Sequence, residues 1–368
     1  MTSARPLNIL FTEHAQGYGG QEHYIHRLML TLREQGQQVE ALCMPGAELV
    51  SRLQDDGFEV HTADMRKGIR NWPAIFSMRR LMRERGYDVV NTNSRQDTLR
   101  AGLAARLARV PLVVRTRHLA KPINSLLAYS MIPQRLITPS EYVRQMLIHK
   151  GVPPEHIQVI GPPVNLPTPL PSATLRQELG LSESDVIVGS VAVLRKDKHM
   201  DELIQAMAPL LKQQASLHLV IVGDGAQRPY LQQQAADLGL NAQVHFLGRR
   251  DDVPALLGDF DIFALASHTE ASGTVFAEAG AARLPTVGYA VTGIPEMINP
   301  GVSGLLVPLQ DIAAFTEALA TLIHNPELRA QMGAAGYQFV VADQRFTMDR
   351  VGQLTLNSYH NWLRELNK

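Results

Sequence analysis

The stretch Gly161-Pro162-Pro163-Val164-Asn165-Leu166-Pro167-Thr168-Pro169-Leu170-Pro171 divides this chain of 368 residues into two parts. Five of these eleven residues are prolines. Because proline lacks a backbone N–H and has a fixed φ, the stretch can continue neither a helix nor a central strand. It therefore predicts a stiff connection between two domains.

On each side of this connection, short apolar segments alternate with longer amphipathic ones. Strict alternation of strand and helix favours right-handed crossovers and a parallel sheet covered on both faces. We therefore predict an α/β fold with two doubly wound, Rossmann-like domains that face each other across a cleft. Before the connection the expected strands are Leu7–Phe11, Val39–Cys43, Asp88–Thr92, Leu112–Arg115, Arg135–Thr138 and Gln158–Ile160, and the expected helices are Gln21–Gln35, Ala74–Arg85, Gln96–Ala108 and Glu141–Lys150. After it the expected strands are Val186–Val193, Leu217–Val222, Val244–Phe246, Ile262–Leu265 and Thr286–Tyr289, and the expected helices are Met200–Lys212, Gln227–Leu238, Val275–Ala282 and Ile312–Ile323.

The expected boundaries are residues 1–165 for the first domain and residues 166–344 for the second. Residues 345–368 are expected to form one further helix that packs back on the first domain.

The composition is that of an ordinary globular protein, with 45% hydrophobic and 19% charged residues. Cys43 is the only cysteine, which excludes a disulfide framework and a cysteine-based zinc site. The first residues contain no basic segment followed by an apolar core, so we expect no signal peptide and a cytoplasmic location. The apolar stretches have the length of strands and are far shorter than the ~20 residues of a membrane span.

The net charge of zero hides an asymmetry between the two halves. Residues 1–165 hold 21 Lys and Arg against 14 Asp and Glu, a net charge of +7, and the remaining residues hold 14 against 21, a net charge of −7. A basic first half is suited to an anionic acceptor or a membrane surface. The alternative is that these charges only solvate the surface.

A glycine-containing loop follows the first expected strand and leads into a helix, from Thr12 to Glu22. Glycines at this place let backbone N–H groups approach an anion at the positive end of a helix. A dinucleotide fingerprint would need a third glycine where Glu22 stands and an acidic residue after the second strand, which ends in Cys43-Met44. NAD binding is therefore excluded, and a purely structural turn stays an alternative.

In the second half, Leu194-Arg195-Lys196-Asp197-Lys198-His199 lies between a strand and a helix. Three cations at such a turn are suited to hold a diphosphate. Val222-Gly223-Asp224-Gly225 ends the next strand, and a simple turn is one interpretation of this segment.

The most informative motif is Ser267-His268-Thr269-Glu270-Ala271-Ser272-Gly273-Thr274-Val275-Phe276-Ala277-Glu278. It places a carboxylate in a loop and a second one in the first turn of the following helix. The start of the helix offers N–H donors to a phosphate, and carboxylates accept hydrogen bonds from sugar hydroxyls. The structural alternative is that Thr274 caps the helix and Glu278 is a favourable first-turn charge.

These motifs, taken in order, resemble those of the retaining glycosyltransferases of family 4, which have the GT-B fold, over nearly the whole chain. Gly19-Gly20-x-Glu22 is similar to the family's N-terminal glycine motif, and Leu194 to Lys198 is similar to its phosphate segment. Glu270 and Glu278 match its pair of glutamates in spacing and position. The other matching segments are Val220–Gly225, Val244–Gly248, Thr292–Glu296 and Gly301–Pro308.

The resemblance implies a role for each matching residue. Glu278 would bind the nucleotide ribose, Glu270 the hydroxyls of the donor sugar, and Arg195 with Lys198 the diphosphate. His118 would reach the reacting sugar across the cleft. The implied donor-binding set is completed by Gly19, Gly20, Arg249, Ser272, Gly273, Thr274 and Val275, largely through their backbone groups.

The sequence departs from the family at four of these places. Val193 stands where the family has its phosphate arginine, so Arg195 would have to replace it. Ser272 stands where an aromatic residue is common, and His199 and Ala266 replace a common glycine and a frequent proline.

Two further motifs have other interpretations. Asp259-Phe260-Asp261 has the form of a metal-binding Asp-x-Asp motif, but it precedes a strand and so does not face a ligand loop. The segment Trp72–Arg85 reads as a basic amphipathic helix that could lie on an anionic bilayer. An ordinary helix that covers the sheet is the alternative.

We therefore expect a retaining, metal-independent hexosyl- or related transferase that moves a sugar from a nucleotide diphosphate-sugar to a glycan or lipid-linked acceptor. The expected setting is the biosynthesis of lipopolysaccharide or another surface polysaccharide, in the cytoplasm, with peripheral contact with the inner face of the membrane. No metal, no other cofactor and no nucleic-acid partner is expected. Two alternatives stay open: a sugar-nucleotide epimerase of the GT-B fold, and a non-catalytic nucleotide-sugar-binding protein.

Overall fold

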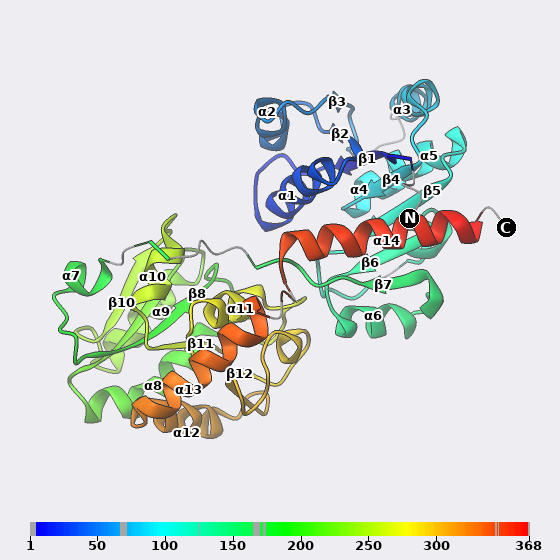
Figure 1. The fold of residues 1–368 in the computed structure, drawn as a ribbon. Helices are drawn as coiled ribbons and strands as arrows, with labels where there is room; N and C mark the ends of the chain where they lie inside the picture. Colours follow the sequence, from blue (N-terminus) through cyan, green and yellow to red (C-terminus); the bar gives the residue numbers. More distant parts are fainter. Residues whose placement is uncertain are drawn as a thin grey trace. The chain divides into compact units, whose positions relative to one another are not determined.

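The chain forms two compact units, each built on its own parallel sheet (Figure 1). A computed structural model describes residues 5–66, 72–123, 125–164, 170–171, 174–342, 344 and 346–366. Unit 1 consists of residues 1–163 and 348–368, and unit 2 of residues 164–347. Residues 165–169, which include the expected boundary and much of the proline-rich connection, lie outside the described residues.

Unit 1 has a seven-stranded parallel sheet with the strand order β3-β2-β1-β4-β5-β6-β7. Alternate residues of its strands pack into two apolar clusters on opposite faces, as Ile9 and Leu10 of β1 illustrate. The strands are β1 (Asn8–Glu13), β2 (Gln38–Cys43), β3 (Val60–Thr62), β4 (Val89–Thr92), β5 (Leu112–Thr116), β6 (Arg135–Thr138) and β7 (Ile157–Val159). The helical segments are α1 (Gly20–Glu34), α2 (Glu48–Asp55), α3 (Trp72–Arg85), α4 (Arg95–Asp97), η2 (Thr98–Gly102), α5 (Leu103–Ala108), η3 (Leu127–Met131), α6 (Glu141–Ile148), η4 (Pro154–His156) and α14 (Met348–Leu366).

The segment expected as one helix from Gln96 to Ala108 is helical over its whole length, but it is not a regular α-helix. The short α-helical pieces α4 and α5 flank a π-helical segment, η2. The carboxylate of Asp97 accepts the backbone N–H groups of Asn93, Ser94 and Thr98 at 2.7–2.8 Å, which fixes a capped turn before the chain continues.

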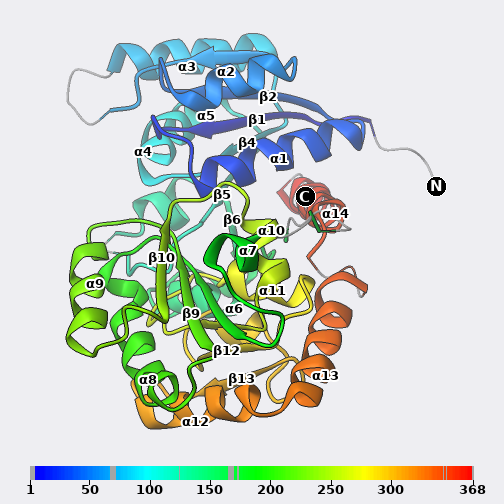
Figure 2. The ribbon, with the colours of Figure 1, turned by 90° about the vertical axis from the view of Figure 1, so that its left-hand side faces the viewer.

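Helix α14 belongs to unit 1, where it packs along α1 (Figure 2). In the interior, Asn91 Nδ2 donates to Tyr359 Oη at 2.5 Å. Gly352 permits a close approach to α1, because a Cβ atom there would come within 2.7 Å of Thr31 Cγ2. The C-terminal helix therefore completes the cover of one face of the first sheet.

Unit 2 has a six-stranded parallel sheet with the order β10-β9-β8-β11-β12-β13 around one apolar core. Both units thus have the doubly wound α/β fold that the alternation of segments predicts, with the strand order turning back beside β1 and β8. The strands are β8 (Val186–Val191), β9 (Leu217–Val222), β10 (Val244–Gly248), β11 (Ile262–Leu265), β12 (Thr286–Tyr289) and β13 (Gly304–Val307). The helical segments are α7 (Leu175–Leu179), η5 (Lys196–Lys198), α8 (Met200–Gln213), α9 (Arg228–Asp237), α10 (Val253–Asp259), α11 (Thr274–Ala281), η6 (Ile294–Glu296), α12 (Ile312–Ile323), α13 (Pro326–Tyr337) and η7 (Gln338–Ala342).

Candidate functional site

The loops after β8 and β11 lie together because these two strands are neighbours in the sheet. In open parallel sheets, ligands bind beyond this edge, where the strands end. The carbonyl oxygen of Asp197 in the first loop accepts the backbone N–H of His268 at 3.2 Å and the hydroxyl of Ser267 at 3.3 Å. These bonds join the basic loop to the loop that carries Glu270.

Lys198 and Glu270 form a direct ion pair across the two loops. The distance from Lys198 Nζ to Glu270 Oε1 is 2.5 Å, and their side chains are only 13% and 14% exposed. The structure thus brings together two of the four residues expected to be catalytic. Their charges neutralise each other in a place where water screens them weakly.

Arg195 is oriented differently. Its side chain is 59% exposed and pairs with Asp197, with 3.1 Å between Nη2 and Oδ2. Val193, at the place of the family arginine, is also exposed. The basic loop therefore presents one half-buried cation, Lys198, and two exposed ones, Arg195 and Lys196.

The backbone of the Glu270 loop is held by the segment that begins at Thr292. Thr292 Oγ1 accepts the N–H of Glu270 at 2.9 Å, and Gly293 donates its N–H to the Glu270 carbonyl at 3.2 Å. A Cβ atom on Gly293 would come within 2.5 Å of the Ala271 carbonyl oxygen, so only glycine fits this close backbone approach. This contact gives the Thr292–Glu296 motif a structural function.

Helix α11 begins at Thr274, one residue earlier than expected. This start corrects the expected positions of Thr274 as the cap and of Glu278 as a residue of the first turn. Gly273, at φ +76, is the N-cap, so Thr274 is the first helical residue and not the cap. Glu278 consequently lies in the second turn and is no first-turn charge. Gly273, Thr274 and Val275 supply the first N–H groups of the helix, whose partners lie outside the helix, and Ser272 is buried beside them.

Glu278 is half-buried, and no side chain in the described part of the protein pairs with its carboxylate. Burial raises the pKa of this carboxyl above its ordinary value. A carboxylate that is partly removed from water and has no partner in the protein gains from a ligand that donates hydroxyl groups.

A second cluster beside the basic loop is not evident from the sequence motifs. Glu202 on α8 accepts hydrogen bonds from His268 Nε2, which lies 2.9 Å from Oε1, and from the Tyr289 hydroxyl, which donates to Oε2 at 2.6 Å. His199 Nδ1 lies 3.3 Å from the same Oε1. The rings of His199 and His268 are stacked, with centroids 3.3 Å apart. His199, Glu202 and His268 offer ligand atoms within 4.8 Å of one another and so could hold a metal ion. The departure from glycine at His199 was the one signal of this cluster in the sequence.

Arg249 is not drawn into the site. Its side chain is 86% exposed and lies 3.9 Å from an oxygen of the fully solvated Asp251. The backbone before it is fixed, because the carbonyl of Gly248 accepts the N–H of Gly223 at 2.8 Å. Arg249 can therefore take part in the expected donor binding through its backbone but not through its side chain in this orientation.

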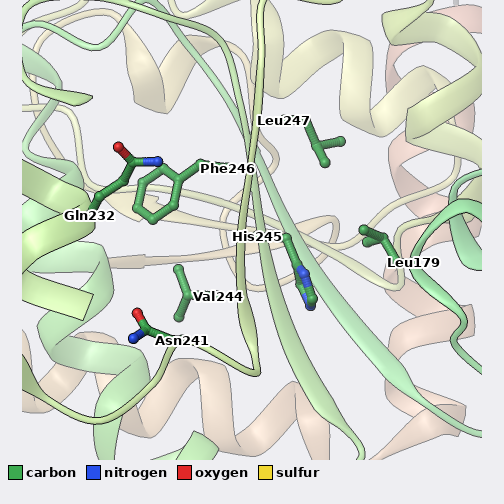
Figure 3. Close-up of a pocket in the computed structure, with 7 residues that line it drawn as sticks. All are labelled: Leu179, Gln232, Asn241, Val244, His245, Phe246 and Leu247. Atoms are coloured by element: carbon green, nitrogen blue, oxygen red, sulfur yellow. The ribbon is translucent and has the colours of Figure 1, made fainter. Parts of the chain in front are cut away.

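A cavity of about 370 Å³ lies along the edge strand β10, and the residues of the basic loop and of the Glu270 loop do not line it (Figure 3). Val244 and Phe246 point to one side of the strand, toward Gln232, whereas His245 points to the other side, toward Leu179. The cavity contains none of the expected site residues. Its position on a sheet edge, and not beyond the strand ends, sets it apart from the site described above.

Asp259 and Asp261, the residues of the Asp-x-Asp motif, bind Arg176. Asp261 Oδ2 accepts from Arg176 Nη2 and from the backbone N–H of Ile187, both at 2.8 Å, and Asp259 Oδ2 accepts the backbone N–H of Arg176 at 3.2 Å. The two carboxylates therefore attach helix α7 to the second sheet.

In unit 1, Gly19 and Gly20 form the exposed start of helix α1. Glu22 Oε2 accepts the N–H of Gly19 at 2.8 Å, and a Cβ atom on Gly20 would contact no other residue. The next residue, Gln21, lines a cavity of about 200 Å³ together with His118. The structure thus places the glycine motif beside the expected histidine.

His118 is held in one tautomer. Asn93 donates Nδ2–H to the Thr12 carbonyl, so its Oδ1 accepts from His118 Nε2 at 3.1 Å, and the edge of the Tyr24 ring packs against the imidazole with centroids 5.2 Å apart. Burial, together with the charges of Arg115 and Arg117, lowers the pKa of His118 to about 3. The imidazole is therefore neutral at physiological pH, and Nδ1 is its acceptor atom.

The two doubly wound units indicate the class of protein, and sequence comparison identifies the family. The description "Glycosyltransferase Family 4" matches residues 18–167, and "Glycosyl transferases group 1" matches residues 171–339. The putative glycosyltransferase EpsD of Bacillus subtilis is 30% identical over 272 residues, which are 68% of this chain and 71% of that protein. The chain belongs to glycosyltransferase family 4 and has the GT-B fold.

Two further relatives show how broad this likeness is. The N-acetyl-alpha-D-glucosaminyl L-malate synthase of Bacillus anthracis is 31% identical over 191 residues, 52% of this chain, so the match spans about half (49%) of that relative. The structure of Anabaena Alr3699/HepE in complex with UDP and glucose has a TM-score of 0.81, with 22% identity over 96% of this chain and 100% of that chain. Among the described residues, no helix is long and apolar enough to cross a membrane.

Proposed function

We propose that this protein is a retaining, metal-independent glycosyltransferase that uses a nucleotide diphosphate-sugar as donor. The observation that carries the proposal is the half-buried Glu278 carboxylate, which has no partner among the described residues. Glu278 lies on helix α11, and the start of this helix follows Glu270, the partner of Lys198, in the sequence. The name of the HepE complex, which contains UDP and glucose, supports a donor of this chemistry.

In this proposal each group of the donor meets a complementary group of unit 2. Glu278 accepts hydrogen bonds from the ribose hydroxyls, and the N–H groups at Gly273–Val275 bind the diphosphate. Lys198 exchanges its contact with Glu270 for the diphosphate, and Glu270 is then available to the sugar hydroxyls. Arg195, in solvent, can turn toward the same diphosphate because its present partner Asp197 is an exposed one.

The reaction breaks the bond between the anomeric carbon of the sugar and the diphosphate oxygen. The acceptor oxygen forms the new bond on the same face, and its proton passes to an oxygen of the departing diphosphate. Lys198 and the N–H groups stabilise the negative charge that develops there, which is the electrostatic contribution of the protein. The neutral His118 accepts one hydrogen bond from a sugar hydroxyl at Nδ1 and does not act as an acid.

For the acceptor we propose a glycan or lipid-linked molecule of a surface polysaccharide or lipopolysaccharide pathway, at the cytoplasmic side of the membrane. Helix α3 supports contact with the membrane: Trp72 and Phe76 are 54% and 56% exposed, and Arg80 and Arg83, on the same side of the helix by their spacing, are also exposed. No contact with nucleic acid is proposed.

Turnover of UDP-, GDP- and ADP-sugars, measured with and without a cell-envelope extract, tests the transferase activity. We expect transfer to depend on the extract and to persist with EDTA. Release of free sugar or an epimer without any acceptor would favour an epimerase, and donor binding without turnover a non-catalytic binder.

The metal-independent mechanism has a separate control. His268→Ala removes one ligand of the His199–Glu202–His268 cluster. If EDTA stops transfer, a divalent metal restores it, and the variant no longer responds to that metal, then the reaction uses this cluster and the proposal of metal independence is wrong.

A further inference from the structure

The cavity beside His118 in unit 1 is strongly basic. It has a volume of about 200 Å³, and its lining includes Arg95, Arg115, Arg117 and Lys121 but, among the described residues, no Asp or Glu. Ligand pockets usually measure roughly 300–1,000 Å³. The size therefore fits one functional group of a substrate better than a whole substrate.

Two of these cations are almost completely buried. Arg115 and Arg117 are 4% and 5% exposed. Arg115 Nη1 donates to the Ala128 carbonyl at 3.0 Å, and Arg117 donates to the Tyr129 hydroxyl and the Lys121 carbonyl. All of these partners are neutral.

The remaining hydrogen-bonding capacity of both guanidinium groups has no partner in the described residues. Nε of Arg115 and Nε of Arg117 are each buried without a hydrogen bond. Their guanidinium carbons lie 4.0 and 5.1 Å from the centre of the Tyr129 ring, which packs against them without neutralising them.

The charge of Asp97 acts on Arg115, but this carboxylate is already engaged. It accepts hydrogen bonds from the Thr12 hydroxyl and from the N–H groups of Asn93 and Ser94 at 2.8 Å, and no salt bridge joins it to either arginine in the described residues. One carboxylate that is shared in this way compensates two buried cations only in part, which is unfavourable. Burial and, after it, the charges of Arg115 and Arg117 lower the pKa of His118, which agrees with an excess of positive charge beside the cavity.

We propose that this cavity binds a phosphate group of the acceptor, so that the acceptor is a phosphorylated sugar, polyol or lipid headgroup. The inference rests on the proposed transferase function. Two buried guanidinium groups with Arg95 and Lys121 at the exposed side match the charge and planar donor geometry that phosphate recognition requires. Because His118 lines the same cavity, a phosphate held there places the neighbouring hydroxyl of the acceptor close to the histidine expected to meet the donor sugar.

Titration of the full-length protein with inorganic phosphate tests the site, with chloride replacing phosphate at constant ionic strength and acetate as a monoanionic control. We expect phosphate to raise the melting temperature of the wild-type protein and of Arg106→Gln, an exposed arginine of the same unit outside the cavity. In Arg117→Gln the apparent affinity for phosphate should fall at least tenfold, roughly the loss of one charge-assisted hydrogen bond. Arg95→Gln, at an exposed position, gives a smaller loss in a variant whose fold is not at risk.

The binding of UDP to the same variants separates this inference from the proposed function. Arg117→Gln should bind UDP as the wild type does, whereas a tenfold loss of UDP affinity would assign the arginines to the donor and overturn the inference. Equal effects of phosphate on all variants, or none on the wild type, would also overturn it. If no protein binds UDP but phosphate behaves as expected, the transferase proposal fails and the phosphate site stands as an oxyanion site only.

The source of the phosphate is distinguished by two acceptor arms. Glucose 6-phosphate is compared with glucose, and vesicles containing phosphatidylinositol are compared with vesicles of phosphatidylcholine alone. Competition with inorganic phosphate by glucose 6-phosphate indicates a free phosphorylated acceptor, and competition only by the anionic vesicles indicates a lipid headgroup. Competition by neither would contradict the inference.

Discussion

Replacing Glu278 by glutamine should change donor affinity and protein stability in opposite directions. In the folded protein this carboxylate is half-buried without a partner, and burial raises its pKa above the ordinary value of 4.5. Glutamine has nearly the same shape but no charge. The free energy of unfolding of Glu278→Gln should therefore rise at neutral pH, because the variant no longer buries an ionised group.

The sign of this effect determines how it depends on pH. A raised pKa means that the folded state binds the proton more tightly than the unfolded state does. Stability is then complete below about pH 4.5 and is lost as the pH rises through the folded pKa. The variant should exceed the wild type in melting temperature at pH 7.5, by about 2–4 °C for each kcal/mol of relief, and should equal it near pH 4.

Donor binding should change the other way. A hydrogen bond to a charged acceptor contributes about 1.5–3 kcal/mol, so the loss of the charge should weaken UDP binding about 10- to 100-fold. Calorimetric titration with UDP and thermal unfolding measure the two effects, and Glu317→Gln, an exposed position on α12, is the matched control. Unchanged UDP affinity would refute the assignment of Glu278 to the ribose. A lower melting temperature at pH 7.5 would refute the inference that its buried charge reduces stability.

The other predictions concern three separate features. Lys198→Ala and Glu270→Ala should each reduce transfer by about 10²–10³-fold, and a double-mutant cycle should give a coupling energy of about 0.5–3 kcal/mol because the two side chains pair directly; additive effects in transfer assays would argue against an interaction that matters. With a pKa of about 3, His118 should give no inflection in the pH profile of kcat/KM near pH 6.5. Below about pH 6.5 the unfolded chain binds a proton at this histidine that the folded protein does not bind, so the stability of the folded protein should fall as the pH drops. His118→Gln should remove this pH dependence in thermal unfolding. Gly293→Ala should destabilise unit 2 by several kcal/mol through its 2.5 Å contact with the Ala271 carbonyl, whereas Gly17→Ala, which contacts nothing, should lower the melting temperature little or not at all.

The fold class followed from the sequence because buried parallel strands are continuous apolar runs that need no knowledge of their partners. Two short strands were not predicted. β3 (Val60–Thr62) has three residues, of which one is apolar and none is fully buried, and β13 (Gly304–Val307) has only four residues, of which the middle two are partly buried. Helix α10 (Val253–Asp259) was missed because it is short and has proline in its first turn.

The motifs of the site were visible in the sequence, but the orientation of their side chains was not. The pairing of Lys198 with Glu270 joins residues 72 positions apart and depends on two loops that are held together by backbone bonds. Arg195 belongs to the same loop, yet its side chain lies in solvent. The start of α11 was misplaced by one residue because Gly273 adopts a left-handed conformation that ends the loop.

Because α14 belongs to unit 1, the sequence of unit 2 is inserted within the sequence of unit 1. During synthesis, residues 164–347 are complete before the final segment of unit 1 has been made, so unit 2 can fold first although it starts later. Until α14 arrives, the face of the first sheet that Tyr359 and Trp362 cover stays open, with apolar surface that invites aggregation. Shortening the C-terminus is therefore expected to destabilise unit 1, while unit 2, which ends just before α14, keeps its core.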